Sequence, residues 1–254
     1  MKKLMAIMFV VLLAGMLAAG CGGTGTKKIV VGLDDNFPPM GFRDDKNNIV
    51  GFDVDMAKAA SKRLGMEVEF KPIDWSSKEA ELSGKRVDVL WNGLTITEKR
   101  KENILFTKAY MENRQIIIVA ANSPVKTKAD LAGKVVGAQE GSSSIEAIEK
   151  DAVTMKSFKE LKKFGDNVAA LMDLKTGRLD AVVVDEIVGR YYIAKKPGEY
   201  TILAENFGSE EYGVGMRKED QELAAKLQKA LDEMKQDGTS AKISQQWFGE
   251  DIVK

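Results

Sequence analysis

Three groups of polar residues, each following an apolar run typical of a strand, could together bind a small zwitterion. Arg100 ends the run Thr97-Glu98-Lys99-Arg100, and its guanidinium can hold a carboxylate with two hydrogen bonds. Residues 141–144, Gly-Ser-Ser-Ser, would open a helix whose free N–H groups and hydroxyls suit the same anion. Asp185 ends the apolar run at 181–184, where a buried carboxylate needs a partner. A carboxylate and an ammonium together form the head group of an α-amino acid.

Each group also has an ordinary structural interpretation. Arg100 could be an exposed residue behind a helix N-cap, the serines could only cap a helix, and Asp185 could pair with an internal Arg or Lys. The serine run is not a P-loop, because the Gly-Lys-Ser/Thr ending is missing. The placement after strands favours a binding site, since ligands of open parallel sheets lie at the carboxyl ends of the strands. The same edge would carry residues 34–37, 91–97 and 140–144.

The elements that would position these groups form a repeated α/β pattern. The β-branched run at 28–32 ends in Gly and recurs at 134–137, and the helix end, glycine and strand at 82–90 recur at 174–182. Helical spacing at 52–64, 168–174 and 186–194 alternates with strand patterns such as 67–70. We therefore predict two α/β lobes of similar build, each a mainly parallel sheet flanked by helices.

The C-terminal elements predict a return of the chain to the first lobe. A short strand at 212–216 precedes an amphipathic helix at 221–235 and a last helix at 240–247. Two hinge strands would then cross between the lobes, near 111–114 and 210–212. We assign residues 27–111 and 212–254 to lobe 1 and residues 112–211 to lobe 2.

The first 26 residues predict export. A short positive segment precedes the apolar run at 4–19, which is too short and too early for a comfortable membrane span, so we interpret residues 1–20 as a signal peptide. Small residues precede Cys21, the only cysteine, and the segment resembles a bacterial lipoprotein box in which this cysteine is lipidated. Ala18 departs from that motif, which more often has Leu there, so cleavage by ordinary signal peptidase is the alternative. Residues 21–26 would form the lipidated end and a tether.

Composition excludes several classes of function. The 254 residues carry 38 Lys plus Arg and 38 Asp plus Glu, so no net field draws the chain to nucleic acid. With no histidine and one cysteine, the common zinc ligand sets and the Cys–His and Ser–His nucleophile pairs are absent. We expect no metal and no other cofactor.

Together these residues resemble the amino-acid-binding proteins of ABC importers, the family 3 solute-binding proteins that include histidine, lysine/arginine/ornithine and glutamine binders. The resemblance runs from about residue 27 to residue 248, and the order and spacing of its motifs carry it: Phe37-Pro38-Pro39 with residues 51–55, residues 94–100, residues 141–143, residues 180–186 and residues 212–218. It implies a type II periplasmic-binding fold, a monomer that is not an enzyme, and a permease partner at the membrane.

The resemblance also implies roles for individual residues. Arg100 would grip the ligand carboxylate, assisted by the amides of Thr95 and of Ser142 or Ser143. Asp185 and the Gly93 carbonyl would hold the ammonium. The remaining expected contacts are packing of Phe37 on the ligand and an aromatic wall from Trp75 or Trp91, which could equally be core residues. Asn92-Gly93 stands where relatives often have Ser-Ser, which puts side-chain hydrogen bonds there in doubt.

Selectivity for the ligand side chain depends on two acids. Asp34 occupies the place where the basic-amino-acid binders have an acid facing the ligand, and Glu140 could add a second negative charge. Both favour Arg or Lys, although both could be loop acids, with Asp34 capping its own turn through Asn36. Glutamine and cystine stay open as ligands. The rival functions are a dehydratase using Glu140 as general acid, a sensing receptor domain and a structural lipoprotein.

Overall fold

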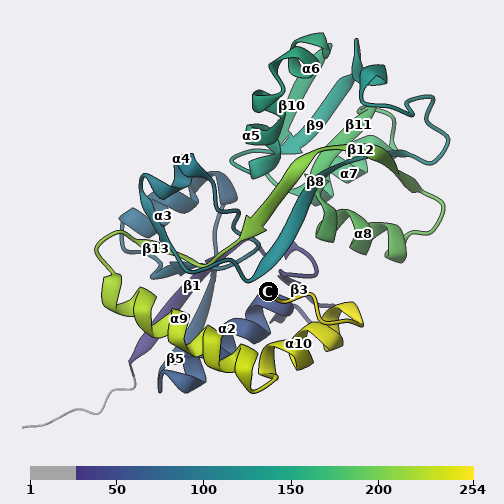
Figure 1. Ribbon diagram of the computed structural model, residues 1–254. Coiled ribbons are helices and arrows are strands. Elements are labelled where there is room, and N and C mark those ends of the chain that lie inside the picture. Colours follow the sequence, from purple (N-terminus) through teal and green to yellow (C-terminus); the bar gives the residue numbers. More distant parts are fainter. Residues whose placement is uncertain (1–26) are drawn as a thin grey trace, which may run out of the picture.

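The computed structural model describes residues 27–254, which form two lobes, each built around a five-stranded sheet (Figure 1). The predicted signal peptide, Cys21 and tether lie outside the described residues. The first sheet has the order β5-β1-β6-β13-β7. Its strands are β1 (Lys28–Leu33), β5 (Glu67–Pro72), β6 (Val89–Leu90), β7 (Ile104–Phe106) and β13 (Gly215–Arg217). The second sheet has the order β10-β9-β11-β8-β12. Its strands are β8 (Met111–Ala120), β9 (Val135–Gln139), β10 (Glu160–Phe164), β11 (Ala181–Asp185) and β12 (Tyr200–Tyr212).

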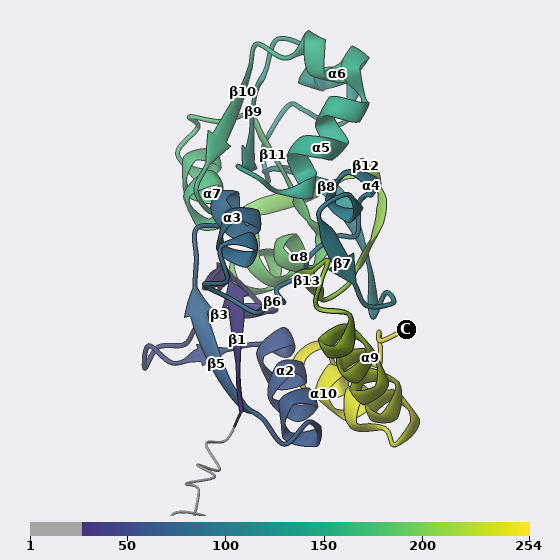
Figure 2. The same cartoon turned by 90° about the vertical axis from the view of Figure 1, so that its left-hand side faces the viewer.

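Helices flank both sheets, which confirms the predicted α/β class (Figures 1 and 2). Those of the first lobe are α2 (Phe52–Arg63), α3 (Lys78–Ser83), α4 (Glu98–Lys101), α9 (Gln221–Gln236) and α10 (Thr239–Phe248). Those of the second lobe are α5 (Ser143–Lys150), α6 (Ala152–Ser157), α7 (Asn167–Lys175) and α8 (Glu186–Lys195). Short 3-10 turns lie at η1 (Trp75–Ser77) and η2 (Ala129–Leu131), and a small sheet joins β2 (Asn36–Phe37), β3 (Gly41–Arg43) and β4 (Ile49–Val50).

The two main sheets are mixed, so the predicted parallel pairing holds for part of each. Strands β5, β1 and β6 pair in parallel, as do β10, β9 and β11. In contrast, β13 is antiparallel to β6 and β7, and β8 is antiparallel to β11 and β12. The predicted strand at 212–216 divides at residues 213–214, with β12 ending before this turn and β13 following it. The parallel group of each sheet contains the strands of the repeated elements, β1 and β6 in one and β9 and β11 in the other.

The long strands β8 and β12 run side by side between the lobes (Figure 1). Their ladder pairs Met111 with Tyr212 and Asn113 with Glu210, within the segments predicted as hinge crossings. Beyond β12 the chain enters β13 of the first sheet, and α9 and α10 then pack against α2. The exact residues that divide the lobes stay a prediction.

Apolar strands position the loops in which the polar groups lie. Every residue of β11 is buried, including Asp185 at its end, as expected for a strand covered on both faces. Leu33 at the end of β1 and Leu90 at the end of β6 are also buried, directly before Asp34 and Trp91. Within residues 27–254, no helix is long and apolar enough to cross a membrane.

Candidate functional site

Arg100 lies in the first turn of α4, at the boundary between the lobes. Thr97 caps this helix as predicted, since its hydroxyl accepts a hydrogen bond from the Arg100 N–H at 3.2 Å. The guanidinium is only 2% exposed and donates to the carbonyls of Thr95 at 2.9 Å and of Gly141 at 3.1 Å. Its Nε has no hydrogen-bond acceptor among residues 27–254, and the Glu146 carboxylate lies 3.7 Å away. Burial lowers the pKa of Arg100, so this cation would gain from a bound carboxylate.

The side chains of Thr95 and Ser143 connect the lobes. Their hydroxyl oxygens lie 2.9 Å apart, with Thr95 before α4 and Ser143 at the start of α5. Ser142 has a different role, because its hydroxyl and its N–H both donate to the Gln139 carbonyl, at 2.7 and 3.3 Å. No side chain caps α5, so its first N–H groups are available to an anion. Of the two serines expected to assist Arg100, Ser143 is therefore the one that faces the first lobe.

Asp185 is a buried carboxylate held by neutral donors. Its Oδ1 accepts hydrogen bonds from the amide groups of Asn113 at 2.7 Å and Gln115 at 3.1 Å, and from the Tyr212 hydroxyl at 2.6 Å. No Lys or Arg of the described chain forms an ion pair with it. Burial raises the pKa of Asp185 to about 8, and the negative charge of Glu210 adds to the rise. The internal Arg or Lys partner of the alternative interpretation is thus missing from residues 27–254, and a ligand ammonium could take that place.

Asp34 is a second buried acid, located after β1 and in contact with the other lobe. Its Oδ1 accepts from the Asn36 N–H at 2.9 Å, so it does cap its own turn. Its Oδ2 accepts from the Gln139 side chain of the second lobe at 2.7 Å. Burial raises the pKa of Asp34 to about 6, and no Lys or Arg within residues 27–254 pairs with it. The side chain therefore combines both interpretations, a turn cap and an acid facing across the lobes.

Gly93, Phe37 and Asn92 lie together beside Asp34. Gly93 has φ +57°, and a Cβ there would lie 2.8 Å from the Phe37 ring, so the ring packs directly on the glycine. The Gly93 N–H donates to the buried Asp53 carboxylate at 2.7 Å. Asn92 accepts from the Asp34 N–H at 3.0 Å, which shows that the Asn-Gly pair still supplies a side-chain hydrogen bond here.

Three predicted residues lie elsewhere or serve the fold. Trp91 is 2% exposed and packs in the core with Tyr110, its ring centroid 6.4 Å from that of Tyr110, which favours the core interpretation. Trp75 is also buried, but its turn η1 lies against Gly141 of the second lobe. Glu140 is exposed and directly follows β9, which ends at Gln139, and this favours the alternative interpretation as a solvated loop acid.

The sequence prediction missed several buried polar residues that complete this region. Lys78 donates to the carbonyls of Gly141 at 2.7 Å and Trp75 at 3.2 Å, and burial followed by the charge of Arg100 lowers its pKa to about 7. Asn113 and Gln115 lie two residues apart on the same buried face of β8. Their spacing of two within a strand could have revealed them. Glu210 lies in a predicted hinge segment. Lys78 had no such signal, because it begins a short helix behind Trp75.

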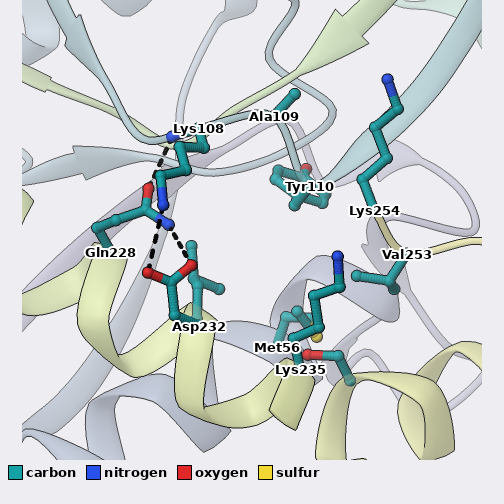
Figure 3. A pocket seen from close by; sticks show the side chains of 11 residues that line it. Met56, Lys108, Ala109, Tyr110, Gln228, Asp232, Lys235, Val253 and Lys254 are labelled. Carbon is teal, nitrogen blue, oxygen red and sulfur yellow. Dashed lines mark hydrogen bonds and ion pairs between the residues drawn. The ribbon is translucent and has the colours of Figure 1, made fainter.

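One cavity, of about 330 Å³, lies next to these residues. It is lined by Thr95, Gln115, Ser143, Glu146 and Glu210, together with neighbouring residues of α5 and β12. Another, of about 220 Å³, lies between the start of β8, α9 and the C-terminus, away from the predicted site (Figure 3). There Gln228 accepts from the Lys108 N–H at 2.7 Å and donates to Asp232 at 2.9 Å, so its side chain connects α9 to the segment before β8. The described residues contain no acid, His or Cys cluster suited to a metal ion.

The buried cations and the buried carboxylates of this region have different hydrogen-bond partners. Arg100 and Lys78 both donate to the Gly141 carbonyl. The carboxylates of Asp185 and Asp34 each accept from neutral donors. A dipolar ligand could supply an opposite charge to both sets of groups, which a simple ion could not.

Comparison with known proteins gives the family. The model of bacterial extracellular solute-binding proteins, family 3, matches residues 29–250. The chain belongs to this family. One similar protein is the L-cystine-binding protein TcyJ of Escherichia coli (strain K12). It is 32% identical over 262 residues, which cover 100% of this chain and 97% of the relative.

Solved structures agree with the two-lobed fold of this family 3 protein. An ABC uptake transporter substrate binding protein from Streptococcus pneumoniae with bound histidine superposes with a TM-score of 0.86 at 36% identity, covering 89% of this chain and 94% of that chain. An ancestral arginine-binding protein bound to arginine gives 0.83 at 43% identity, covering 87% and 98%. The family is one of extracellular solute-binding proteins, which confirms the predicted family and fold and favours solute binding over the dehydratase alternative.

Proposed function

We propose that this protein binds a free polar L-amino acid, preferentially a basic one, between its lobes and delivers it to the permease of an ABC importer. The observation that carries the proposal is a pair of buried ionisable groups of opposite type: the Arg100 guanidinium, whose Nε lacks a hydrogen-bond acceptor, and the Asp185 carboxyl, which has no cationic partner among residues 27–254. An α-carboxylate and an α-ammonium would complete both. The Ser143 end of α5 and the Thr95 side chain would assist.

The preference for a basic side chain rests on Asp34. This acid is buried, contacts Gln139 of the second lobe and has no Lys or Arg partner within the described chain. A ligand guanidinium or ammonium would neutralise it. The similar ancestral arginine-binding protein supports the same preference. Cystine is the second candidate, supported by the relative named for it, because its second ammonium could also reach Asp34.

Delivery requires that the protein change shape around its ligand. We infer that β8 and β12 act as the hinge and that the ligand favours the closed arrangement, because its carboxylate contacts one lobe and its ammonium the other. We further propose that Cys21 carries a lipid that holds a monomer at the membrane beside its permease, with residues 22–26 as the tether.

A thermal-shift screen of the purified mature protein tests this proposal. The twenty amino acids, ornithine, citrulline and cystine are each added at about one hundred times the expected dissociation constant. Binding at that ratio stabilises the folded state by about 2.7 kcal/mol, which raises the Tm of a chain of this size by roughly 5–10 °C. We expect the largest shift with arginine or lysine. A shift with cystine alone would select the second candidate, and no shift with any compound would contradict the proposal.

A further inference from the structure

Glu210 places a second carboxylate beside Asp185, on the hinge strand β12. Its Oε1 accepts hydrogen bonds from the Asn113 amide at 2.7 Å, the Gln115 amide at 2.8 Å, the Thr95 hydroxyl at 2.9 Å and the Ser143 hydroxyl at 3.2 Å. All four donors are neutral. No Lys or Arg within residues 27–254 forms an ion pair with this carboxylate. The Glu210 carboxylate is therefore oriented by neutral hydrogen-bond donors, and no Lys or Arg within residues 27–254 neutralises it.

Two side-chain amides bind both carboxylates at once. The Asn113 nitrogen donates to Asp185 and to Glu210, each at 2.7 Å. The Gln115 nitrogen donates to the same two acids, at 3.1 and 2.8 Å. Two carboxylate oxygens that share two donors lie close together, and like charges so near each other favour an added proton or cation.

Space for a ligand group lies next to this pair. Glu210 lines the cavity of about 330 Å³ together with Thr95, Gln115 and Ser143. The Thr95 hydroxyl has a single hydrogen, and if it donates to Glu210 its lone pairs remain to accept from a ligand N–H. A primary ammonium has three N–H donors, enough for two acids and this hydroxyl.

We propose that Glu210 and Asp185 form a two-carboxylate subsite for the ammonium group of the ligand, with Glu210 as the member supplied by the hinge. This inference rests on the proposed amino-acid-binding function and adds a residue to it. Because Glu210 lies on β12 and contacts Thr95 and Ser143 of opposite lobes, occupation of the subsite also ties the ligand to the hinge.

Proton release on binding distinguishes this role from a purely structural one. Burial and the charge of Glu210 raise the pKa of Asp185 to about 8, so at pH 7 this carboxyl is largely protonated before a ligand arrives. An arriving ammonium favours the ionised form and expels the proton. Among the groups that act on Asp185, Tyr212 keeps its proton at pH 7 because burial raises its pKa well above the ordinary value, and Arg100 stays charged.

The experiment is calorimetric titration at pH 7 with L-arginine, L-glutamine and L-cystine, each in buffers of different ionisation enthalpy, for the wild type and Glu210→Gln. We expect the wild type to release close to one proton per ligand bound. Glu210→Gln should release fewer, because loss of the Glu210 charge removes one of the two main causes that raise the pKa of Asp185, and should bind about tenfold more weakly. Glu210→Asp keeps the charge and should retain the proton release. It serves as the second variant if Glu210→Gln disturbs the fold.

Glu211→Gln is the matched control, because Glu211 is the next residue on β12 and its side chain pairs with Lys254 at 2.6 Å. It should behave as the wild type. Unchanged proton release or unchanged affinity in Glu210→Gln would overturn the inference while leaving the proposed function intact. Failure of the wild type to bind any of the three amino acids would instead overturn the proposed function, and the inference with it.

Discussion

Arg100, Asp34 and Asp185 are buried ionisable residues, and each is surrounded mainly by neutral hydrogen-bond partners. Burying an ionised group costs several kcal/mol unless an opposite charge compensates it. The carbonyls beside Arg100 and the amides beside the two acids compensate only in part. A zwitterionic ligand would supply the missing charges, so these buried residues favour the binding of a molecule with matching charges.

Asp34 gives a prediction about selectivity. Asp34→Asn keeps the size of the side chain and an oxygen for the Asn36 N–H, but removes the negative charge. We expect arginine and lysine to bind 10- to 100-fold more weakly, a loss of about 1.4–2.8 kcal/mol, while glutamine changes little. Calorimetric titration measures this.

Asp35→Asn is the control, since Asp35 is the neighbouring residue and pairs with Arg43 at 2.5 Å outside the site. It should leave all affinities unchanged. Equal losses for arginine and glutamine in Asp34→Asn would refute the role of Asp34 in selectivity and point to a general effect on the loop.

Sequence reasoning predicted that some of the interlobe polar residues would lie close together and missed others for a physical reason. Arg100, Ser143, Asp185 and Asp34 each follow a strand, and the carboxyl ends of strands converge, so their meeting could be expected. Lys78 enters the region from a short helix through a long, flexible side chain. Such a side chain can reach in several directions, and only the packed structure fixes which.

At the scale of elements, the two lobes meet where the turn η1 packs on the loop after β9. Gly141 in that loop has φ +72°, and a Cβ added to it would lie 2.8 Å from the Ser76 backbone of the first lobe. Glycine is therefore favoured at this position for two reasons: it adopts this backbone conformation without strain, and it leaves room for the other lobe. Lys78 and Arg100 fix the same point by donating to the Gly141 carbonyl.

Gly141→Ala consequently tests whether closure and binding are coupled. The added methyl should hold the lobes apart and weaken arginine binding at least tenfold. Gly133→Ala is a close control, because Gly133 has φ +71° but no atom within 4 Å of its added Cβ. Both variants should lose about 1–2 kcal/mol of unfolding free energy from backbone strain. If Gly141→Ala bound arginine as tightly as Gly133→Ala, the contact would not matter for binding.

The order and type of the elements followed from the sequence better than their pairing did. Helical and strand periods predicted α2, β5, α7, α8, α9 and α10 with small differences at their ends. The antiparallel placement of β13 and β8 was not predicted, because a period of two is the same for either direction. The direction depends on the route of the chain between the lobes, which is a property of the whole fold.

In the molecule as a whole, the two lobes joined by β8 and β12 would enclose one ligand between them. The lobes touch through Arg100 and Gly141, Thr95 and Ser143, and Asp34 and Gln139. These three contacts bring together the anionic and cationic ends of a single site, so each chain should bind one amino acid. Family membership and the similarity to solved two-lobed structures agree with this arrangement.

Titration calorimetry of L-arginine into the wild type and into Arg100→Ala is the most direct test of whether this cleft binds one amino acid through its carboxylate. We predict one ligand per chain for the wild type. In Arg100→Ala, loss of the buried carboxylate partner should weaken binding by more than 100-fold, about 3 kcal/mol or more, while circular dichroism shows a folded protein. Unchanged affinity in a folded Arg100→Ala protein would contradict the claim that this cleft holds the amino-acid carboxylate.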